Sequence, residues 1–198
     1  MTIERNMSSL QTKKSTFTKN LILTAAAELV DTLDMNDLSF KKVSEHAGIA
    51  ERTMFRYFRS RDEFLDAFAA KLHSNLQLPS MPNVTEGLEE FVEQLFHSFE
   101  AQPRLVHLLL DPQLLPHIIN TSSKLRLREL IVLLTQHYPQ CDNLVITHTA
   151  ANLRYFMSAS TWRYYREMFN FDLSSSIQCV QMVVRQALAD LNLPENRD

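Results

Sequence analysis

Apolar residues recur at intervals of three and four positions along most of the chain. Between residues 18 and 34 they form a single stripe, made of Ile22, Ala25, Ala26, Leu29, Val30 and Leu33. An α-helix turns once every 3.6 residues, so this spacing predicts an amphipathic helix. Similar patterns predict helices over residues 40–47, 50–58, 61–76, 88–102, 105–110, 113–137, 142–169 and 174–193. The chain is therefore expected to be all-α, with about nine helices.

Residues 1–17 lack this helical periodicity. They are expected to form a flexible N-terminal arm, because chain ends without buried apolar residues are usually frayed. The arm carries Lys13 and Lys14 close to the first predicted helix. A second interpretation is that this basic arm reaches DNA, as the arms of some DNA-binding proteins do.

Residues 38–65 carry the signals of a helix-turn-helix followed by a third helix. Ser39 is a predicted N-cap, since its hydroxyl can accept a backbone N–H of the first turn. Gly48 is predicted to end that helix in the left-handed conformation. In the next helix, Met54 and Phe58 are four residues apart and face the core. The outward face of this predicted recognition helix carries Arg52, Thr53, Arg56 and Tyr57.

Basic residues gather in the same stretch. From Ser39 to Arg61, Lys41, Lys42, Arg52, Arg56, Arg59 and Arg61 stand against Glu45 and Glu51, a local excess of four positive charges. The whole chain has a net charge of −3. A basic patch on an acidic protein is expected where phosphates bind. The alternative is three ordinary helices joined by a glycine C-cap, and the charge pattern favours DNA binding over it.

The sequence from Gly48 to Leu65 reads GIAERTMFRYFRSRDEFL. It joins a glycine and an apolar residue, a threonine, an apolar-aromatic pair and a phenylalanine. Ser60 and Glu63 follow at the spacing of a capping box, which starts a helix. This pattern closely resembles the DNA-binding domain of TetR-family transcriptional regulators, and the likeness covers about the first seventy residues. The resemblance implies an all-helical homodimer whose second domain binds a small molecule.

The resemblance also implies which side chains meet DNA. These are Ser39, Lys42, Ala50, Arg52, Thr53, Arg56, Tyr57 and Arg61. Ser44 and Glu51 depart from the family pattern, which has a small apolar alanine and a neutral or basic residue there. Glu51 would repel phosphate, or it would accept a hydrogen bond from a cytosine amino group. The operator sequence is therefore left open.

Composition excludes several other classes of protein. The chain has two glycines, Gly48 and Gly87, and so lacks the glycine spacing of phosphate-binding loops, dinucleotide fingerprints and the G-x-S-x-G elbow. We therefore expect no enzyme. Cys141 and Cys179 are too few for a disulfide framework, and no histidine pair has metal-site neighbours, so no metal or cofactor is expected. No secretory signal and no run of about 18 apolar residues is present, which predicts a cytoplasmic protein without a membrane span.

Pro79 and Pro82 lie in the one stretch that reads as a linker. We therefore expect an arm at residues 1–17, a helix-turn-helix domain at 18–76, and an effector-binding and dimerisation domain at 77–198. This last part has a net charge of −4, which does not favour nucleic acid. Its helix over residues 113–137 is expected to bend or break near Pro116 and Asn120.

The helices predicted over residues 142–169 and 174–193 are apolar on more than one face, so each must be covered on two sides. The resemblance implies a bundle of four helices, two from each subunit, and a symmetric dimer suits a palindromic operator. The residues expected at this interface are Trp162, Tyr165, Val180, Val184, Ala187 and Leu188.

The resemblance further implies an effector cavity in the second domain. The candidate lining residues are Phe96, His107, Leu130, Leu134, Phe156 and Met157. A stripe of methionine and aromatic residues is, however, more often plain core. Arg154 interrupts an otherwise apolar helix face. It either pairs with a carboxylate such as Glu93 or binds an anionic effector, and the ion pair is the favoured interpretation.

Together these patterns predict a sequence-specific DNA-binding transcriptional regulator. The resemblance implies a homodimeric repressor that a small apolar effector releases from a palindromic operator in double-stranded DNA. The alternative is an all-α protein-interaction module, which would bind DNA weakly and without sequence preference.

Overall fold

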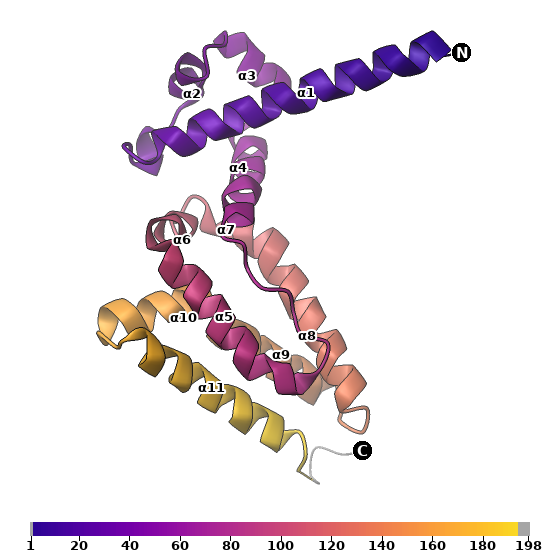
Figure 1. Cartoon of the computed structure of the whole chain (residues 1–198), viewed down its shortest axis with the longest axis vertical. Coiled ribbons are helices and arrows are strands. Elements are labelled where there is room, and N and C mark those ends of the chain that lie inside the picture. Colours follow the sequence, from indigo (N-terminus) through magenta and orange to yellow (C-terminus); the bar gives the residue numbers. More distant parts are fainter. Residues whose placement is uncertain (1, 194–198) are drawn as a thin grey trace. The chain divides into compact units, whose positions relative to one another are not determined.

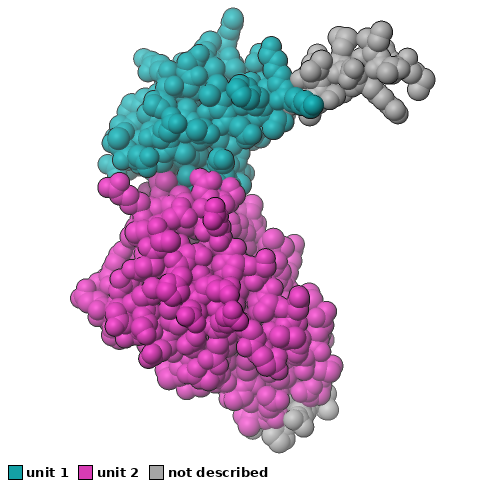
Figure 2. All heavy atoms as spheres, viewed as in Figure 1, with its two compact units in different colours: residues 1–72 teal, residues 73–198 magenta. Residues whose placement is uncertain are grey.

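The computed structural model describes the backbone of residues 2–193 and the side chains of residues 13–193. This part of the chain is helical and contains no strand, so the all-α prediction is confirmed. The chain divides into two compact units, Met1–Leu72 and His73–Asp198 (Figure 2). The division lies inside a helix, a few residues before the boundary expected at residues 76 and 77. None of the described helices is both long and apolar enough to cross a membrane.

Unit 1 contains the N-terminal helices. In chain order these are α1 (Thr2–Leu29), a 3₁₀ turn (Met35–Asp37), α2 (Phe40–His46), α3 (Glu51–Tyr57) and α4 (Arg61–Asn75), whose last residues belong to unit 2. Helix α1 begins at Thr2, so residues 2–17 are helical where an arm was expected (Figure 1). No glycine or proline lies between residues 1 and 29, and helix propagation past a formed turn costs little.

The core of unit 1 is aromatic. The ring of Phe64 on α4 lies 5.6 Å from Phe40 on α2, 5.3 Å from Phe58 after α3 and 5.6 Å from Phe68 one turn along α4, measured between centroids. Phe58, Phe64 and Phe68 are buried, and so is Met54, as the four-residue spacing predicted. Edge-to-face ring pairs add to the free energy of burial. These contacts fix α2, α3 and α4 against one another.

Unit 2 is a bundle with several short connecting helices. Its elements are a 3₁₀ turn (Thr85–Gly87), α5 (Leu88–Ala101), α6 (Pro103–Leu109), α7 (Leu115–Ile118), a π-helical turn (Ile119–Ser123), α8 (Lys124–His137), α9 (Asn143–Phe156), α10 (Ala159–Arg163), a second π-helical turn (Tyr164–Met168) and α11 (Leu173–Asp190). Helix α8 packs on α9, α9 on α11, and α11 on α5 (Figure 1).

The helices predicted over residues 113–137 and 142–169 are each interrupted once. The π-helical turn at Ile119–Ser123 lies where a break near Pro116 and Asn120 was predicted. The second break, between α9 and α10, was not predicted. There the Ser158 hydroxyl accepts from the backbone N–H of Thr161 at 3.2 Å, and the Thr161 hydroxyl donates to the Tyr155 carbonyl at 2.8 Å. Side chains thus satisfy backbone groups on both sides of the break.

A polar cluster joins α5 to α10 and to the π-helical turn that follows α10. One Glu100 carboxylate oxygen accepts from Trp162 Nε1 at 3.0 Å and Arg166 Nε at 3.0 Å, and the other accepts from Arg166 Nη2 at 2.7 Å. These bonds, those from Arg166 above all, lower the pKa of Glu100 below its ordinary value of 4.5. A carboxyl group with a lowered pKa stabilises the fold at pH values where it is ionised.

We predict that Glu100→Gln lowers the unfolding midpoint at pH 7, because the glutamine cannot pair with the Arg166 charge. The folded-state pKa is depressed, so this contribution is present above pH 4.5 and is lost as the pH falls through the lowered value. Denaturation measured from pH 7 to pH 3 should show the unfolding midpoints of Glu100→Gln and the unmodified protein converging in acid. Glu93→Gln, at an exposed position of α5, is the control and should match the unmodified chain throughout. A difference in unfolding midpoint between Glu100→Gln and the unmodified protein that stayed constant down to pH 3 would contradict a stabilising role for ionised Glu100.

Candidate nucleic-acid interface and effector cavity

The turn between α2 and α3 is built by backbone hydrogen bonds around Gly48. This glycine has φ +66°, the left-handed conformation predicted for it. Its N–H donates to Glu45 O at 3.2 Å, and the N–H of Ile49 donates to Ser44 O at 3.0 Å. This pair of bonds is the Schellman motif, which closes a helix C-terminus and turns the chain sharply. At the other end of α2, the Ser39 hydroxyl accepts from the Lys42 N–H at 3.3 Å, as predicted for an N-cap.

Helix α3 presents one polar face. Arg52 and Arg56 are exposed, Thr53 and Tyr57 are half-buried, and Met54 on the opposite side is fully buried. The predicted inward and outward faces of the recognition helix are therefore confirmed. Other predicted DNA contacts are also exposed in unit 1, namely Ser39 and Lys42 at the start of α2 and Ala50 at the N-cap of α3.

Tyr57 is tied to its surroundings. The Thr18 hydroxyl of α1 lowers the pKa of the Tyr57 phenol, and the Arg56 guanidinium, with its Cζ 5.2 Å from the ring centroid, lowers it further. Beside it, the Lys19 ammonium lies 5.1 Å from the centroid of the Phe58 ring. Helix α1 therefore brings basic and hydroxyl groups to the end of the recognition helix.

Arg61 has a structural role besides the phosphate contact that was expected. Its Nη1 donates to Leu38 O at 2.7 Å and its Nη2 to Met35 O at 3.3 Å. The guanidinium thus ties the first turn of α4 to the segment that precedes α2. Both acceptors are backbone carbonyls, so no sequence motif identifies them. Arg61 thus stabilises unit 1, and its side chain is exposed, so its expected contact with DNA stays a prediction.

The two departures from the family pattern have local explanations. The Ser44 side chain is buried, and its hydroxyl donates to Lys41 O at 2.9 Å, so a polar residue is satisfied in that space. Glu51 is exposed in the first turn of α3, where a negative charge is favourable beside the unpaired N–H groups. In the capping box, the Ser60 hydroxyl accepts from Glu63 N at 3.1 Å, while the Glu63 carboxylate accepts from Arg59 N at 2.8 Å.

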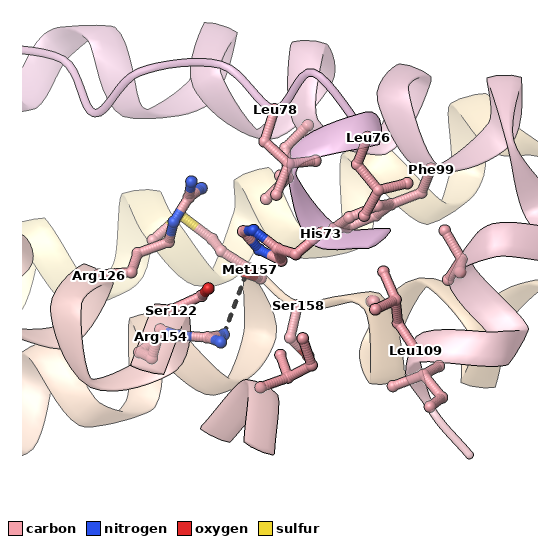
Figure 3. Close-up of a pocket in the computed structure, with 15 residues that line it drawn as sticks. His73, Leu76, Leu78, Phe99, Leu109, Ser122, Arg126, Arg154, Met157 and Ser158 are labelled. Atoms are coloured by element: carbon pink, nitrogen blue, oxygen red, sulfur yellow. Dashed lines mark hydrogen bonds between the residues drawn. The ribbon is translucent and has the colours of Figure 1, made fainter. Parts of the chain in front are cut away.

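Unit 2 contains a partly open cavity of about 70 Å³. It is lined by His73, Leu76, Leu78, Leu95, Phe99, Val106, Leu109, Leu110, Ile118, Ser122, Arg126, Arg154, Met157, Ser158 and Ala159 (Figure 3). Of the six predicted lining residues, Met157 alone is among them. Phe96, Leu130 and Leu134 are fully buried core residues, Phe156 is half-buried, and His107 is exposed and hydrogen-bonded to Glu167.

The polar side of this cavity is formed by Arg154 and Arg126. Arg154 donates to the Ser123 hydroxyl at 2.5 Å, to Ser123 O at 3.4 Å and to Met157 O at 3.5 Å. No carboxylate of the described chain lies within ion-pair distance of Arg154, so the favoured pairing with Glu93 does not form. Burial lowers the pKa of Arg154 to about 10, and the nearby charge of Arg126 contributes.

The predicted dimer interface is largely inside the chain. Trp162, Val180 and Val184 are buried within unit 2, so they have no surface to offer a second subunit. The other three, Tyr165, Ala187 and Leu188, are half-buried. A helix that is apolar on two faces does not itself tell which face meets its own core. The buried residues Trp162, Val180 and Val184 are therefore withdrawn from the predicted interface.

Other residues of the same helices are exposed instead. On α9 the exposed residues follow the helical period at Leu144, His148, Ala151 and Tyr155, and on α11 they include Met182 and Ala189. The exposed fraction is 62% for Leu144, 67% for Tyr155 and 49% for Met182. Exposed residues of this size on two helices that pack together form a candidate interface.

The cysteines and histidines offer no metal centre in the described part of the chain. No three His, Cys, Asp or Glu side chains gather there closely enough to hold an ion. Cys141 and Cys179 are free thiols, and Cys141 Sγ donates to Leu191 O at 3.1 Å.

Comparison with known proteins agrees with this geometry. Residues 22–68 match the family described as bacterial regulatory proteins, tetR family. No curated protein matches the sequence. Among solved structures, NalD, the secondary repressor of the MexAB-OprM multidrug efflux pump in Pseudomonas aeruginosa, has a TM-score of 0.61 at 14% identity, over 88% of this chain and 96% of its own. The fatty acid degradation regulator FadR from Bacillus halodurans has a TM-score of 0.55 at 18% identity, over 84% and 93%. At these identities the likeness is one of fold.

We predict that Arg61→Met lowers the unfolding midpoint, because it removes the guanidinium donor from Leu38 O and leaves Met35 O with the backbone N–H of Leu38 alone. Hydrogen bonds from charged groups are worth about 1.5–3 kcal/mol each when buried, and these are partly exposed, so a loss of about 1–3 kcal/mol is expected. Arg59→Met, an exposed neighbour, should change stability by less than about 0.5 kcal/mol. Chemical denaturation gives the free energy of unfolding of both variants. An equal loss in Arg61→Met and Arg59→Met would contradict the structural role of Arg61.

Proposed function

We propose that the chain is a regulator of the tetR family, whose model matches residues 22–68, and that it acts as a homodimeric, sequence-specific repressor of transcription controlled by a small molecule. The observation that carries the proposal is the polar face of α3, held outward by the burial of Met54 and Phe58. A rigidly mounted helix with exposed arginines is what reading of the major groove requires.

DNA contacts divide into two kinds in this proposal. Arg52, Thr53 and Glu51 lie in the first turn of α3, where a recognition helix meets base edges, so they are proposed to select the sequence. Arg59 and Lys42 are exposed at the ends of neighbouring elements and are proposed to bind phosphates. Phosphate contacts raise affinity for all DNA, whereas base contacts distinguish one operator from another.

The cavity of unit 2 is proposed as the effector site. Helix α4 supplies residues to both units: Phe64 and Phe68 lie in the core of unit 1, and His73 lines the cavity. An effector that binds one conformation better than another shifts the equilibrium between them, and couplings of about 1–3 kcal/mol are typical. A shift of that size is sufficient to change operator occupancy about tenfold.

The proposed dimer uses the exposed apolar residues of α9 and α11. A symmetric pair places the same face of each chain in contact, and it presents two recognition helices to a palindromic operator. Half-sites are then about 34–36 Å apart, one turn of the DNA helix, or a related distance. The repressor role follows the resemblance in fold to NalD, which is itself a repressor.

We predict that the protein enriches a palindrome from a pool of random duplexes at near-physiological salt. Arg52→Ala and Thr53→Ala should each change the enriched bases at the same positions of both half-sites, since a bidentate base contact is worth about 1–3 kcal/mol. The matched control, Arg59→Ala, should weaken all duplexes and leave the enriched sequence unchanged.

Two outcomes of this selection would count against the proposal. An unchanged base preference in Arg52→Ala would remove that residue from the reading face. Failure of the folded protein to enrich any sequence, with or without effector, would favour the alternative of an all-α protein-interaction module.

We also predict that Met182→Arg converts the dimer to a monomer, because it replaces the large exposed apolar residue of α11 by a charge. Val132→Arg, at an equally exposed apolar position of α8, serves as the control and should remain dimeric. Light scattering at matched concentration distinguishes the two states. A dimeric Met182→Arg protein with native helicity would exclude α11 from the interface.

A further inference from the structure

The cavity in unit 2 has two cationic side chains and no anion. Arg126 and Arg154 both line it, and the residues that surround it in the described chain include no Asp or Glu (Figure 3). A buried cation is ordinarily paired, because the loss of hydration is otherwise uncompensated. The arginines are therefore in an environment that a negatively charged partner would stabilise.

Arg126 has unused hydrogen-bonding capacity. Its Nη1 is buried and has no hydrogen-bond partner, and its Nη2 reaches Pro79 O at the long distance of 3.5 Å. The guanidinium lies 5.0 Å from the centroid of the Phe91 ring, a cation–π contact that leaves its N–H groups available in the guanidinium plane. Buried donors without acceptors are uncommon in folded proteins and call for an explanation.

Arg154 is held in place by neutral groups. The Ser123 hydroxyl, the Ser123 carbonyl and the Met157 carbonyl accept its hydrogen bonds, and none of them carries a charge. Burial lowers the pKa of Arg154, and the nearby charge of Arg126 lowers it further. Burial, followed by these same two charges, also lowers the pKa of His73, so this third basic group of the cavity is neutral at pH 7.

The rest of the lining is apolar. Figure 3 shows Arg126, Ser122 and Arg154 toward one end of the cavity, Phe99 and Leu109 toward the other, and Met157 between them. A lining that is cationic at one end and aliphatic or aromatic at the other is complementary to a molecule with a charged head and an apolar body.

We propose that the cavity binds a small amphipathic carboxylate, with its head between Arg126 and Arg154 and its apolar chain toward Phe99 and Leu109. A guanidinium offers paired N–H donors whose spacing matches the two oxygens of a carboxylate. Binding of the carboxylate depends on the cavity alone, whereas regulation by it rests on the proposed function. A carboxylate ligand would take the place of the small apolar effector that was expected from the sequence.

The size of the cavity limits the ligand. At about 70 Å³ it is smaller than the roughly 150 Å³ cavity that accommodates benzene in a protein core. Arg126 also lines a surface groove of about 400 Å³ between residues 79–83 and α8. The Arg126 side chain thus lines both the groove and the cavity. Short acids fit with the least rearrangement.

The test uses calorimetry on the full-length protein with straight-chain acids from butanoate to octanoate. Each acid is compared with the primary alcohol and the primary amine of equal chain length. At the best chain length we expect the acid to bind at least tenfold more tightly than the alcohol, and the amine not to bind. Alcohols that bind as tightly as the acids, or the absence of binding by any acid, would overturn the proposal.

Variants assign the head group to its partners. Arg154→Met and Arg126→Met should each lower acid affinity at least tenfold, to the level of the alcohol, whereas Arg128→Met should bind like the unmodified protein. Arg128 is exposed on α8 and does not line the cavity. Arg154→Lys keeps the charge and should retain part of the acid preference. Full acid preference in both methionine variants would overturn the assignment.

The methionine variants also give a second readout. Methionine replaces a half-buried charge that has no carboxylate beside it in the cavity, so both variants should unfold at a higher temperature than the unmodified protein. A lower unfolding temperature in both would mean that the arginines serve the fold and not a ligand.

Operator release is measured separately, by fluorescence anisotropy with the selected duplex. Acid binding without operator release would leave the carboxylate site intact and contradict the regulatory coupling in the proposed function. Operator binding by a protein that binds none of the acids would leave the regulator intact and overturn the carboxylate site.

Discussion

The packing of Phe64 against Phe40 and Phe58 is the contact on which the DNA-binding unit depends. It joins α4 to α2 and to the end of α3 in a single aromatic cluster. Because these rings are close-packed, the orientation of α3 is set by the core and not by the flexible polar residues on its surface. The exposed face of α3 can therefore vary in sequence without loss of the fold.

Unit 2 shows the opposite relation between stability and function. The polar cluster of Glu100, Trp162 and Arg166 is fully satisfied and connects two segments of the bundle. Arg126 and Arg154, by contrast, are half-buried beside one another with no carboxylate in the cavity they line, and the Glu129 charge that acts on Arg126 lies outside that lining. A fold selected for stability alone would have paired or replaced them. Sites that break such a rule without local compensation are expected where a partner binds.

The sequence predicted features that depend on local chemistry. Ser39 and Gly48 were identified because capping and a left-handed turn each need particular residue types. Features that depend on tertiary contacts were missed. Arg61 donates to backbone carbonyls 23 and 26 residues away, which no motif reveals. For Val184, periodicity showed an apolar face, but its burial in the chain's own core required the positions of the neighbouring helices. The cavity lining was missed for the same reason.

The turn at Gly48 separates two reasons for which a glycine is needed. Its φ is +66°, yet a Cβ added there would meet no atom within 4 Å. The position is thus restricted by the handedness of the chain and not by space. For an L-residue the left-handed conformation costs about 1–2 kcal/mol, whereas it is the favoured conformation of a D-residue. The turn is accordingly a place where the mirror-image amino acid would suit the backbone better than any coded residue except glycine.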